Sequence, residues 1–222
     1  MKLLITDYNF QESDLNPLLL SKSKEMQLAL EKLPLHLKAS DQKGKQGTPI
    51  FDPVGTNNAI KTAFVNLEWD PNVTIPAEYN FLGTDVDFSL QGIVAEVQFS
   101  NYPFLLNNLL RSELFYKSKI PLPSNPLDLL VVITKAGMFP SSNSTLYYEQ
   151  AQKQLSALSD GNVFDVPIRL IGLTSETGKI ITAKWTDYSS ARYSRTVHKQ
   201  SDIEVRVEIP VGQRRKAEIY RL

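Results

Sequence analysis

The stretch from residue 82 to residue 104 constrains the fold most, because its pattern describes two strands joined by a tight turn. Two strand-like runs, 84–88 and 93–99, flank a glycine-containing turn at residues 89–92, which predicts a β-hairpin. Side chains alternate along the second run, because successive residues of a strand point to opposite faces. One face is apolar (Ile93, Ala95, Val97 and Phe99), and the other carries Val94, Glu96 and Gln98.

The hairpin also concentrates carboxylates. Asp85 and Asp87 share one face of the first run, and Glu96 lies on the second. If the two runs pair in simple register, these carboxylates converge, which is the geometry that a hard divalent cation such as Mg²⁺ requires. Two acids on a hairpin are more often a solvated strand face. The apolar residues around Glu96 favour the metal site, because an unpartnered carboxylate is costly to bury.

The rest of the chain alternates between helical and strand-like patterns. Helices are predicted over 14–33, 57–69, 104–117 and 146–158, and strands over 2–6, 129–134, 166–173, 179–185 and 203–209. The continuously apolar run 129–134 is typical of a strand buried in a central sheet. Polar loops are predicted over 36–48, 135–144 and 187–198. We expect a single domain over residues 1–222, with residues 184–222 forming a β-rich C-terminal extension of it.

Composition excludes several kinds of site. The chain contains no Cys, which excludes disulfides, thiol nucleophiles and zinc–thiolate sites, and it contains only two His. A metal would therefore be bound by oxygen ligands, which favours Mg²⁺ or Mn²⁺. No apolar run approaches the length of a membrane span, and the first residues lack a signal-peptide pattern. We therefore expect an intracellular protein with no membrane partner.

Charge is distributed unevenly although the net charge is zero. Residues 184–222 carry nine Lys and Arg against five Asp and Glu. A solvated surface is the plainer interpretation of such an excess, and contact with nucleic acid is the other. The loop over 36–48 leaves a similar choice, since Lys38, Lys43 and Lys45 could contact phosphates or simply lie in an exposed loop.

Several strings of residues reveal a relationship. They include FDPVGTN (51–57), FLGTDVDF (81–88), EVQFSNYPFLLNN (96–108), NVFDVPIRL (162–170) and RYSRT (192–196). In this order they resemble the BglII family of type II restriction endonucleases, a branch of the PD-(D/E)xK nucleases. That superfamily usually has Lys as the third motif residue, whereas this branch, like this chain, has Gln, here Gln98. The resemblance implies an α/β fold with a central mixed β-sheet flanked by helices and additional β-strands in the C-terminal part.

The resemblance also implies an active site. Asp87 and the backbone carbonyl of Val97 would hold one Mg²⁺, or Mn²⁺, with Glu96 beside it. Gln98 and Asn72 would position the attacking water by hydrogen bonding. Asp85 competes with Asp87 for the metal on pattern alone, and the family match selects Asp87.

Three segments match the DNA-binding segments of the family. The residues implied are Ser100, Asn101, Ser142, Asn143, Ser144, Arg192, Tyr193 and Arg195. Short amides and hydroxyls suit base edges in the major groove, although Ser144 equally suits a helix cap. Arg can contact guanine or phosphate through two hydrogen bonds. The family has a Lys two residues before the Tyr, where this chain has Ala191.

The implied reaction is hydrolysis of a phosphodiester in double-stranded DNA at the palindrome AGATCT, cut after the first A. A palindrome suits a homodimer, because two identical subunits can each cut one strand. The helix over 104–117 is a candidate for the dimer contact, since its apolar residues exceed one core face; burial within the monomer is the alternative. Rival interpretations are a nuclease with a relaxed RGATCY target, a catalytically inactive DNA-binding homologue, and a carbohydrate hydrolase with paired carboxylates.

Overall fold

The computed structural model describes residues 1–137, 139–140, 145–190, 195–209 and 217–222. The larger of its two sheets has the strand order β1-β8-β7-β6-β5-β4. Its strands are β1 (Lys2–Tyr8), β4 (Asp70–Thr74), β5 (Asp85–Leu90), β6 (Ile93–Val97), β7 (Leu129–Lys135) and β8 (Ile168–Thr174). The sheet is mixed, since β6, β7 and β8 run parallel and the other neighbours pair antiparallel. Strand β7 is buried along its whole length, as its apolar run predicts.

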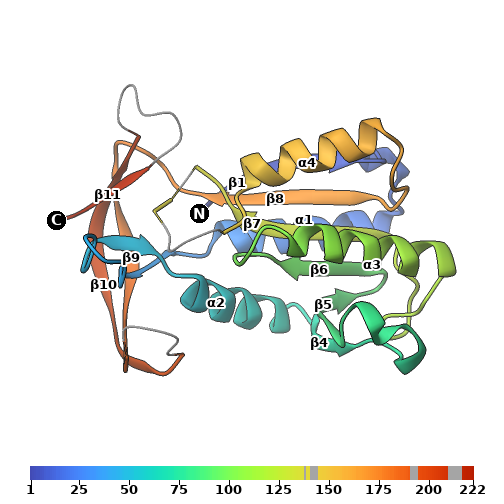
Figure 1. Cartoon of the computed structure of the whole chain (residues 1–222), viewed down its shortest axis with the longest axis horizontal. Coiled ribbons are helices and arrows are strands. Elements are labelled where there is room, and N and C mark those ends of the chain that lie inside the picture. Colours follow the sequence, from blue (N-terminus) through green and yellow to red (C-terminus); the bar gives the residue numbers. More distant parts are fainter. Residues whose placement is uncertain (138, 141–144, 191–194, 210–216) are drawn as a thin grey trace.

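Helices cover both faces of this sheet. The described residues form α1 (Pro17–Glu31), α2 (Pro53–Val65), α3 (Phe104–Ser118) and α4 (Tyr148–Asp160), with short 3-10 helices η1 (Glu12–Asp14) and η2 (Ala77–Leu82). In Figure 1, α3 and α4 lie in front of the sheet and α1 lies behind it. Leucines of α3 and α4 pack on one face, and α1 and α2 contribute Met26, Leu30, Ile60 and Phe64 to a separate core cluster on the other. The α/β prediction is therefore confirmed.

Helices α1 and α2 begin in the same way. The side chains of Asn16 and Asp52 each accept a hydrogen bond from the first turn, and a proline follows as the first helical residue. Proline suits that position because its missing N–H would have no helical partner there. The predicted helix over 57–69 was therefore placed four residues too late. It ends at Val65, a few residues before Glu68 takes a left-handed φ of 65°.

The second sheet combines residues from both ends of the chain. Its strand order is β11-β10-β9-β2-β3, built from β2 (Leu35–Ala39), β3 (Pro49–Phe51), β9 (Ile180–Tyr188), β10 (Val197–Glu208) and β11 (Glu218–Arg221). Strand β2 pairs in parallel with β9, so the predicted loop over 36–48 was wrong at its start. One core cluster contains Ile133 of β7 together with Trp185 of β9 and Val205 of β10, so the two sheets share a hydrophobic core.

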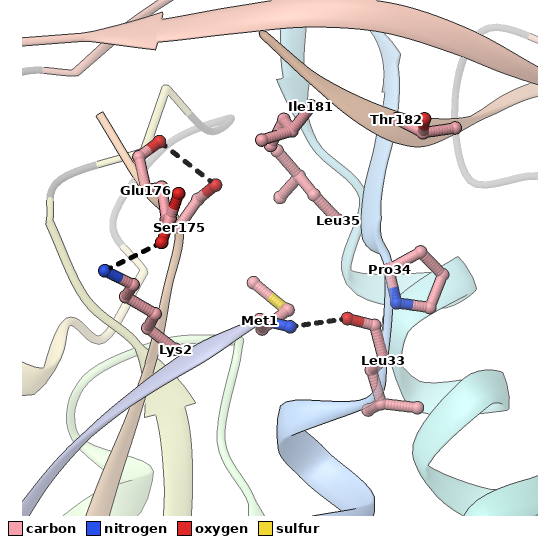
Figure 2. Close-up of a pocket in the computed structure, with 9 residues that line it drawn as sticks. All are labelled: Met1, Lys2, Leu33, Pro34, Leu35, Ser175, Glu176, Ile181 and Thr182. Atoms are coloured by element: carbon pink, nitrogen blue, oxygen red, sulfur yellow. Dashed lines mark hydrogen bonds and ion pairs between the residues drawn. The ribbon is translucent and has the colours of Figure 1, made fainter. Parts of the chain in front are cut away.

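A cavity of about 380 Å³ lies where the N-terminal strand meets the second sheet (Figure 2). The amino group of Met1 donates to the carbonyl of Leu33 at 2.7 Å, and Lys2 forms an ion pair with Glu176 at 3.0 Å. Burial lowers the pKa of that amino group. The amino group of Met1 and the side chain of Lys2 therefore tie the start of the chain to the segment before β2 and to the turn after β8.

Candidate active site

The predicted hairpin forms around a tighter turn than its sequence suggests. Strands β5 and β6 pair from Phe88–Ala95 to Leu90–Ile93, leaving a two-residue loop of Gln91 and Gly92. Both loop residues have positive φ values, 49° and 91°, which matches the twist of a two-residue hairpin. The side chain of Ser89 donates to the carbonyl of Ile93 at 3.2 Å, so the turn is fixed from within.

Register places three predicted residues level with one another across neighbouring strands. The pairs Pro71–Phe88 and Val73–Val86 put Asn72 of β4 opposite Asp87 of β5. Extending the β5–β6 register by one step beyond Phe88–Ala95 puts Asp87 opposite Glu96. The ladder opens at that step because the Asp87 carboxylate itself accepts the backbone N–H of Val97, at 2.7 Å.

Asp87 and Asn72 line one cavity of about 250 Å³ with Val97. Lys61 and Arg195 line the same cavity. Burial is the main cause that raises the pKa of the Asp87 carboxyl, and the hydrogen bond from Val97 opposes it. Asn72 has a left-handed φ of 52°, a conformation that Asn tolerates better than most residues. The cavity therefore combines oxygen donors with two cations.

Glu96 lies on the buried side of the same strand row. Only 4% of its surface is exposed, and its carboxylate forms an ion pair with the guanidinium of Arg111 from α3. Burial raises the pKa of Glu96 to about 8, while Arg111 acts in the opposite direction. The ion pair alone would lower the pKa of Glu96, but burial has the larger effect and the net change is upward. A carboxylate in this position is stabilised by any further positive charge.

Gln98 links the end of strand β6 to the segment after it. Its amide nitrogen donates to Ser100 at 3.2 Å and to the carbonyl of Asn101 at 3.4 Å. Its amide oxygen accepts from Asn108 of α3 at 3.1 Å. Gln98 is 5% exposed, whereas Ser100 and Asn101 are exposed. A buried amide thus sets the position of two residues that are predicted to contact DNA.

The predicted base-reading loop is tied to this segment at its base. The backbone N–H of Leu146 donates to the carbonyl of Ser100 at 2.9 Å, and Asn101 pairs with Thr145 in an isolated bridge. The hydroxyl of Thr134 lies 2.8 Å from the carbonyl oxygen of Gln98 and 3.1 Å from that of Leu146. The two chain segments are therefore held as one unit at the end of β6 and β7.

The structure brings some of the predicted site residues together and leaves others outside its description. Asn72, Asp87, Val97 and Arg195 share a cavity, while Glu96 and Gln98 face α3. Ser142, Asn143, Ser144, Arg192 and Tyr193 lie outside the described residues, as does Ala191. Sequence analysis missed Arg111, Asn108, Lys61 and Thr134. A hint was available for two of them, because Asn108 and Arg111 interrupt an apolar helix at a spacing that puts both on one face.

The donor set fits a magnesium-type cation. No group of three or more His, Asp and Glu side chains suited to a metal occurs among the residues described. Mg²⁺ nevertheless uses one or two carboxylates and keeps several waters. The half-buried carboxylate of Asp87 beside the backbone of Val97, with Glu96 on the adjoining strand, meets that requirement. These are the residues that would hold the ion.

Comparisons with known proteins identify the family of the chain. The family model described as restriction endonuclease BglII/BglIII matches residues 7–173. The type II restriction enzyme BglII of Bacillus subtilis is 51% identical over 219 residues, covering 97% of each chain. A crystal structure of BglII complexed with a DNA 16-mer matches with a TM-score of 0.94 at 49% identity, and one of free BglII with 0.75 at 45%; each comparison covers 100% of both chains.

The fold, the acid pair on the hairpin and these similarities define a type II restriction endonuclease. Enzymes of this class generally use a divalent metal. The chain belongs to the restriction endonuclease BglII/BglIII family. No helix among the described residues is long and apolar enough to cross a membrane.

Proposed function

We propose that the chain cleaves double-stranded DNA at the palindrome AGATCT, after the first A, with Mg²⁺ or Mn²⁺ as its cofactor, in the bacterial cytoplasm. The observation that carries the proposal is the cavity in which Asp87 and Asn72 lie close to Lys61 and Arg195. A carboxylate that can hold a metal is thus adjacent to cations that can hold a DNA phosphate. The target is chosen by likeness to BglII, since the strings that match this family extend over most of the chain.

In this mechanism Asp87, Glu96 and the carbonyl of Val97 would hold the metal. When bound there, a divalent cation would lower the pKa of bound water and neutralise charge that grows on the scissile phosphate. Glu96 would orient a ligand water or accept its proton. Gln98 does not titrate and carries no charge, so its amide acts through hydrogen bonds alone. Asn72 positions the water from β4, level with Asp87.

Recognition is assigned to the segments around the catalytic strands. Ser100 and Asn101 read base edges together with Ser142, Asn143, Ser144 and Tyr193, because short amides and hydroxyls both donate and accept hydrogen bonds. Arg192 and Arg195 contact phosphate or guanine. The contacts that join Leu146 to Ser100 and Gln98 to Asn101 support this assignment, because they connect base reading to the catalytic strand.

A homodimer is proposed because each subunit has one acid pair and a palindrome has two equivalent strands. Helix α3 exposes a row of large apolar side chains, with Phe104 50% exposed, Leu106 41% and Leu110 59%. Leu106 and Leu110 lie four residues apart and so share one face of the helix. Replacing Leu110 by Lys is expected to shift sedimentation toward monomer at micromolar concentration. The matched control is Leu28→Lys on α1, where Leu28 is 57% exposed, and this variant should remain dimeric.

The decisive experiment is Mg²⁺ digestion of plasmids that each carry one variant of the hexamer, with sequencing of the ends. Cleavage at AGATCT alone supports the proposed target. Cleavage at all RGATCY sites favours the relaxed nuclease. That alternative is considered because this chain has Ala191 where the family has a Lys. If the wild-type chain cuts none of these plasmids with Mg²⁺ or Mn²⁺, the catalytic proposal fails. Asp87→Ala serves as the control that should bind the DNA without cutting it.

A further inference from the structure

Arg111 is a buried cation that the proposed mechanism does not use. It is 5% exposed, although arginine is rarely buried to that degree without partners. Its Nη2 forms the ion pair with Glu96, and its Nη1 donates to the backbone carbonyl of Asp85 at 2.9 Å. The guanidinium therefore contacts both strands of the catalytic hairpin from the helix that packs against them.

Space for this guanidinium depends on a glycine. Gly83 precedes β5 with a φ of 139°, and a Cβ added there would lie 2.3 Å from Nη1 of Arg111. No other residue type could stand at that position without moving the guanidinium. The side chain of Asn107 also donates to the carbonyl of Leu82 at 3.1 Å, so the helix and the chain entering β5 are joined at two successive points.

The same face of α3 also contacts Gln98, the residue that stands where the nuclease motif usually has lysine. Asn108 donates to the amide oxygen of Gln98, and its own oxygen lies 3.5 Å from Nη2 of Arg111. Residues three apart on a helix rise about 4.5 Å, and residues two apart on a strand rise about 6.7 Å. The two spacings are similar enough for the side chains to meet in two pairs. Asn108 contacts Gln98, and Arg111 contacts Glu96.

This arrangement places a positive charge where the motif itself supplies none. Gln98 is neutral, and Lys61 and Arg195 line the cavity on the Asp87 side. Arg111 approaches the acid pair from the opposite, buried side. The charge that a lysine at position 98 would bring thus comes from Arg111 of α3. Asn108 connects the two residues, because it bonds Gln98 and lies 3.5 Å from Arg111.

We propose that Arg111 is a positioning residue for DNA cleavage: it holds the Glu96 carboxylate in place and supplies beside the acid pair the positive charge that Gln98 lacks. The inference rests on the proposed nuclease function. The two can fail separately, because cleavage by the wild-type chain tests the function and the Arg111 variants are compared with that rate.

The first test compares Arg111→Met with wild type in single-turnover cleavage and in DNA binding with Ca²⁺ in place of Mg²⁺. Residues that orient a ligand typically change metal affinity or activity by about 10–100-fold when removed. We expect Arg111→Met to cleave about 100-fold more slowly and to need about tenfold more Ca²⁺ for tight DNA binding, measured by fluorescence anisotropy. Cleavage within threefold of wild type, or faster, would overturn the proposal.

The second test moves the charge. In the double variant Arg111→Met with Gln98→Lys, a lysine directly after β6 replaces the cation removed from α3. We expect cleavage to recover at least about tenfold relative to Arg111→Met alone. A purely structural role predicts no recovery, because the lysine cannot rebuild the contact with the Asp85 carbonyl, and an absence of recovery would refute the proposal.

Folding is monitored by the melting temperature of every variant. Should Arg111→Met not fold, Arg111→Lys keeps a charge but loses the planar fork that reaches both strands. It is then expected to cleave more slowly than wild type and to retain more activity than Arg111→Gln. Equal rates for Arg111→Lys and Arg111→Gln would contradict a role for the charge.

Discussion

Two buried arginines lie on opposite faces of the larger sheet, and their surroundings differ. Arg169 of β8 is 1% exposed and donates to both oxygens of Asp7, at 2.8 and 2.6 Å, to Ser23 at 2.9 Å and to Glu12 at 3.1 Å. Arg111 pairs with one buried acid, and its Nε has no partner. Each nitrogen of the Arg169 guanidinium has a partner, whereas Nε of Arg111 has none.

The partner acids differ in the same way. Asp7 is 23% exposed at its side chain and Glu12 is 51% exposed, whereas Glu96 is 5% exposed. Asp7 and Glu12 reach solvent, whereas Glu96 is buried, and burial raises the pKa of Glu96 to about 8. The Arg169 cluster stabilises the fold. The Arg111 pair leaves a carboxylate that a further cation would stabilise, which is what a metal-binding position requires.

The sharpest way to separate the two clusters is to remove the acid from each. Glu96→Ala is expected to lower single-turnover cleavage by about 10⁴-fold, because it removes both a metal position and a proton acceptor. Asp7→Ala should leave the rate per folded molecule unchanged, since Glu12 still pairs with Arg169. A comparable loss of cleavage in both variants would show that the contrast between the clusters is mistaken.

The second prediction concerns stability rather than rate. Arg169→Met leaves the carboxylate of Asp7 without its cation inside a packed region, and breaking a buried pair by removing one partner costs about 3–5 kcal/mol. We expect the free energy of unfolding in urea to fall by about 3 kcal/mol, toward the low end because Asp7 is partly solvated. Cleavage per folded molecule should stay within twofold of wild type. If cleavage per folded molecule fell by more than twofold, Arg169 could not be assigned to stability alone.

How much of this site the sequence predicts depends on how local the pattern is. The alternation along residues 93–99 predicts that Glu96 and Gln98 share a face, and the hairpin brings Asp87 beside Glu96. Arg111 was missed because a charged residue in a helix is expected to face solvent, and only the packing of α3 on β6 shows otherwise. Strand β2 was missed because its neighbour β9 lies far away in the chain, so no local pattern reveals the pairing.

A third buried cation, Lys135, gives a pH-dependent prediction. It lies at the end of β7, 1% exposed, and donates to the carbonyl of Leu146 at 3.2 Å. Burial lowers the pKa of Lys135 from 10.5 to about 7. The folded state therefore disfavours the charged amine, so its cost is full below about pH 7 and disappears as the pH rises toward 10.5.

Lys135→Met removes that cost and tests its sign. The variant is expected to be more stable than wild type at pH 6.5, by up to a few kcal/mol, and the difference should shrink steadily toward pH 9.5. Urea unfolding at four pH values measures it. Arg169→Met is the matched control, because arginine stays charged throughout this range. A difference that stays constant across these pH values would show that the amine remains charged in the folded protein.

The smallest expected effect concerns an uncharged contact between the catalytic strand and the predicted base-reading loop. Thr134→Val keeps the shape of the side chain but removes the hydroxyl shared between the carbonyls of Gln98 and Leu146. Loss of one buried hydrogen bond costs about 1 kcal/mol. We expect unfolding to be easier by about that amount, and the ratio of cleavage at AGATCT to cleavage at singly altered sites to fall several-fold. Thr62→Val on α2, where the hydroxyl bonds only within its own helix, should leave this ratio unchanged; a similar drop in both variants would assign the effect to general destabilisation rather than to the link between recognition and cleavage.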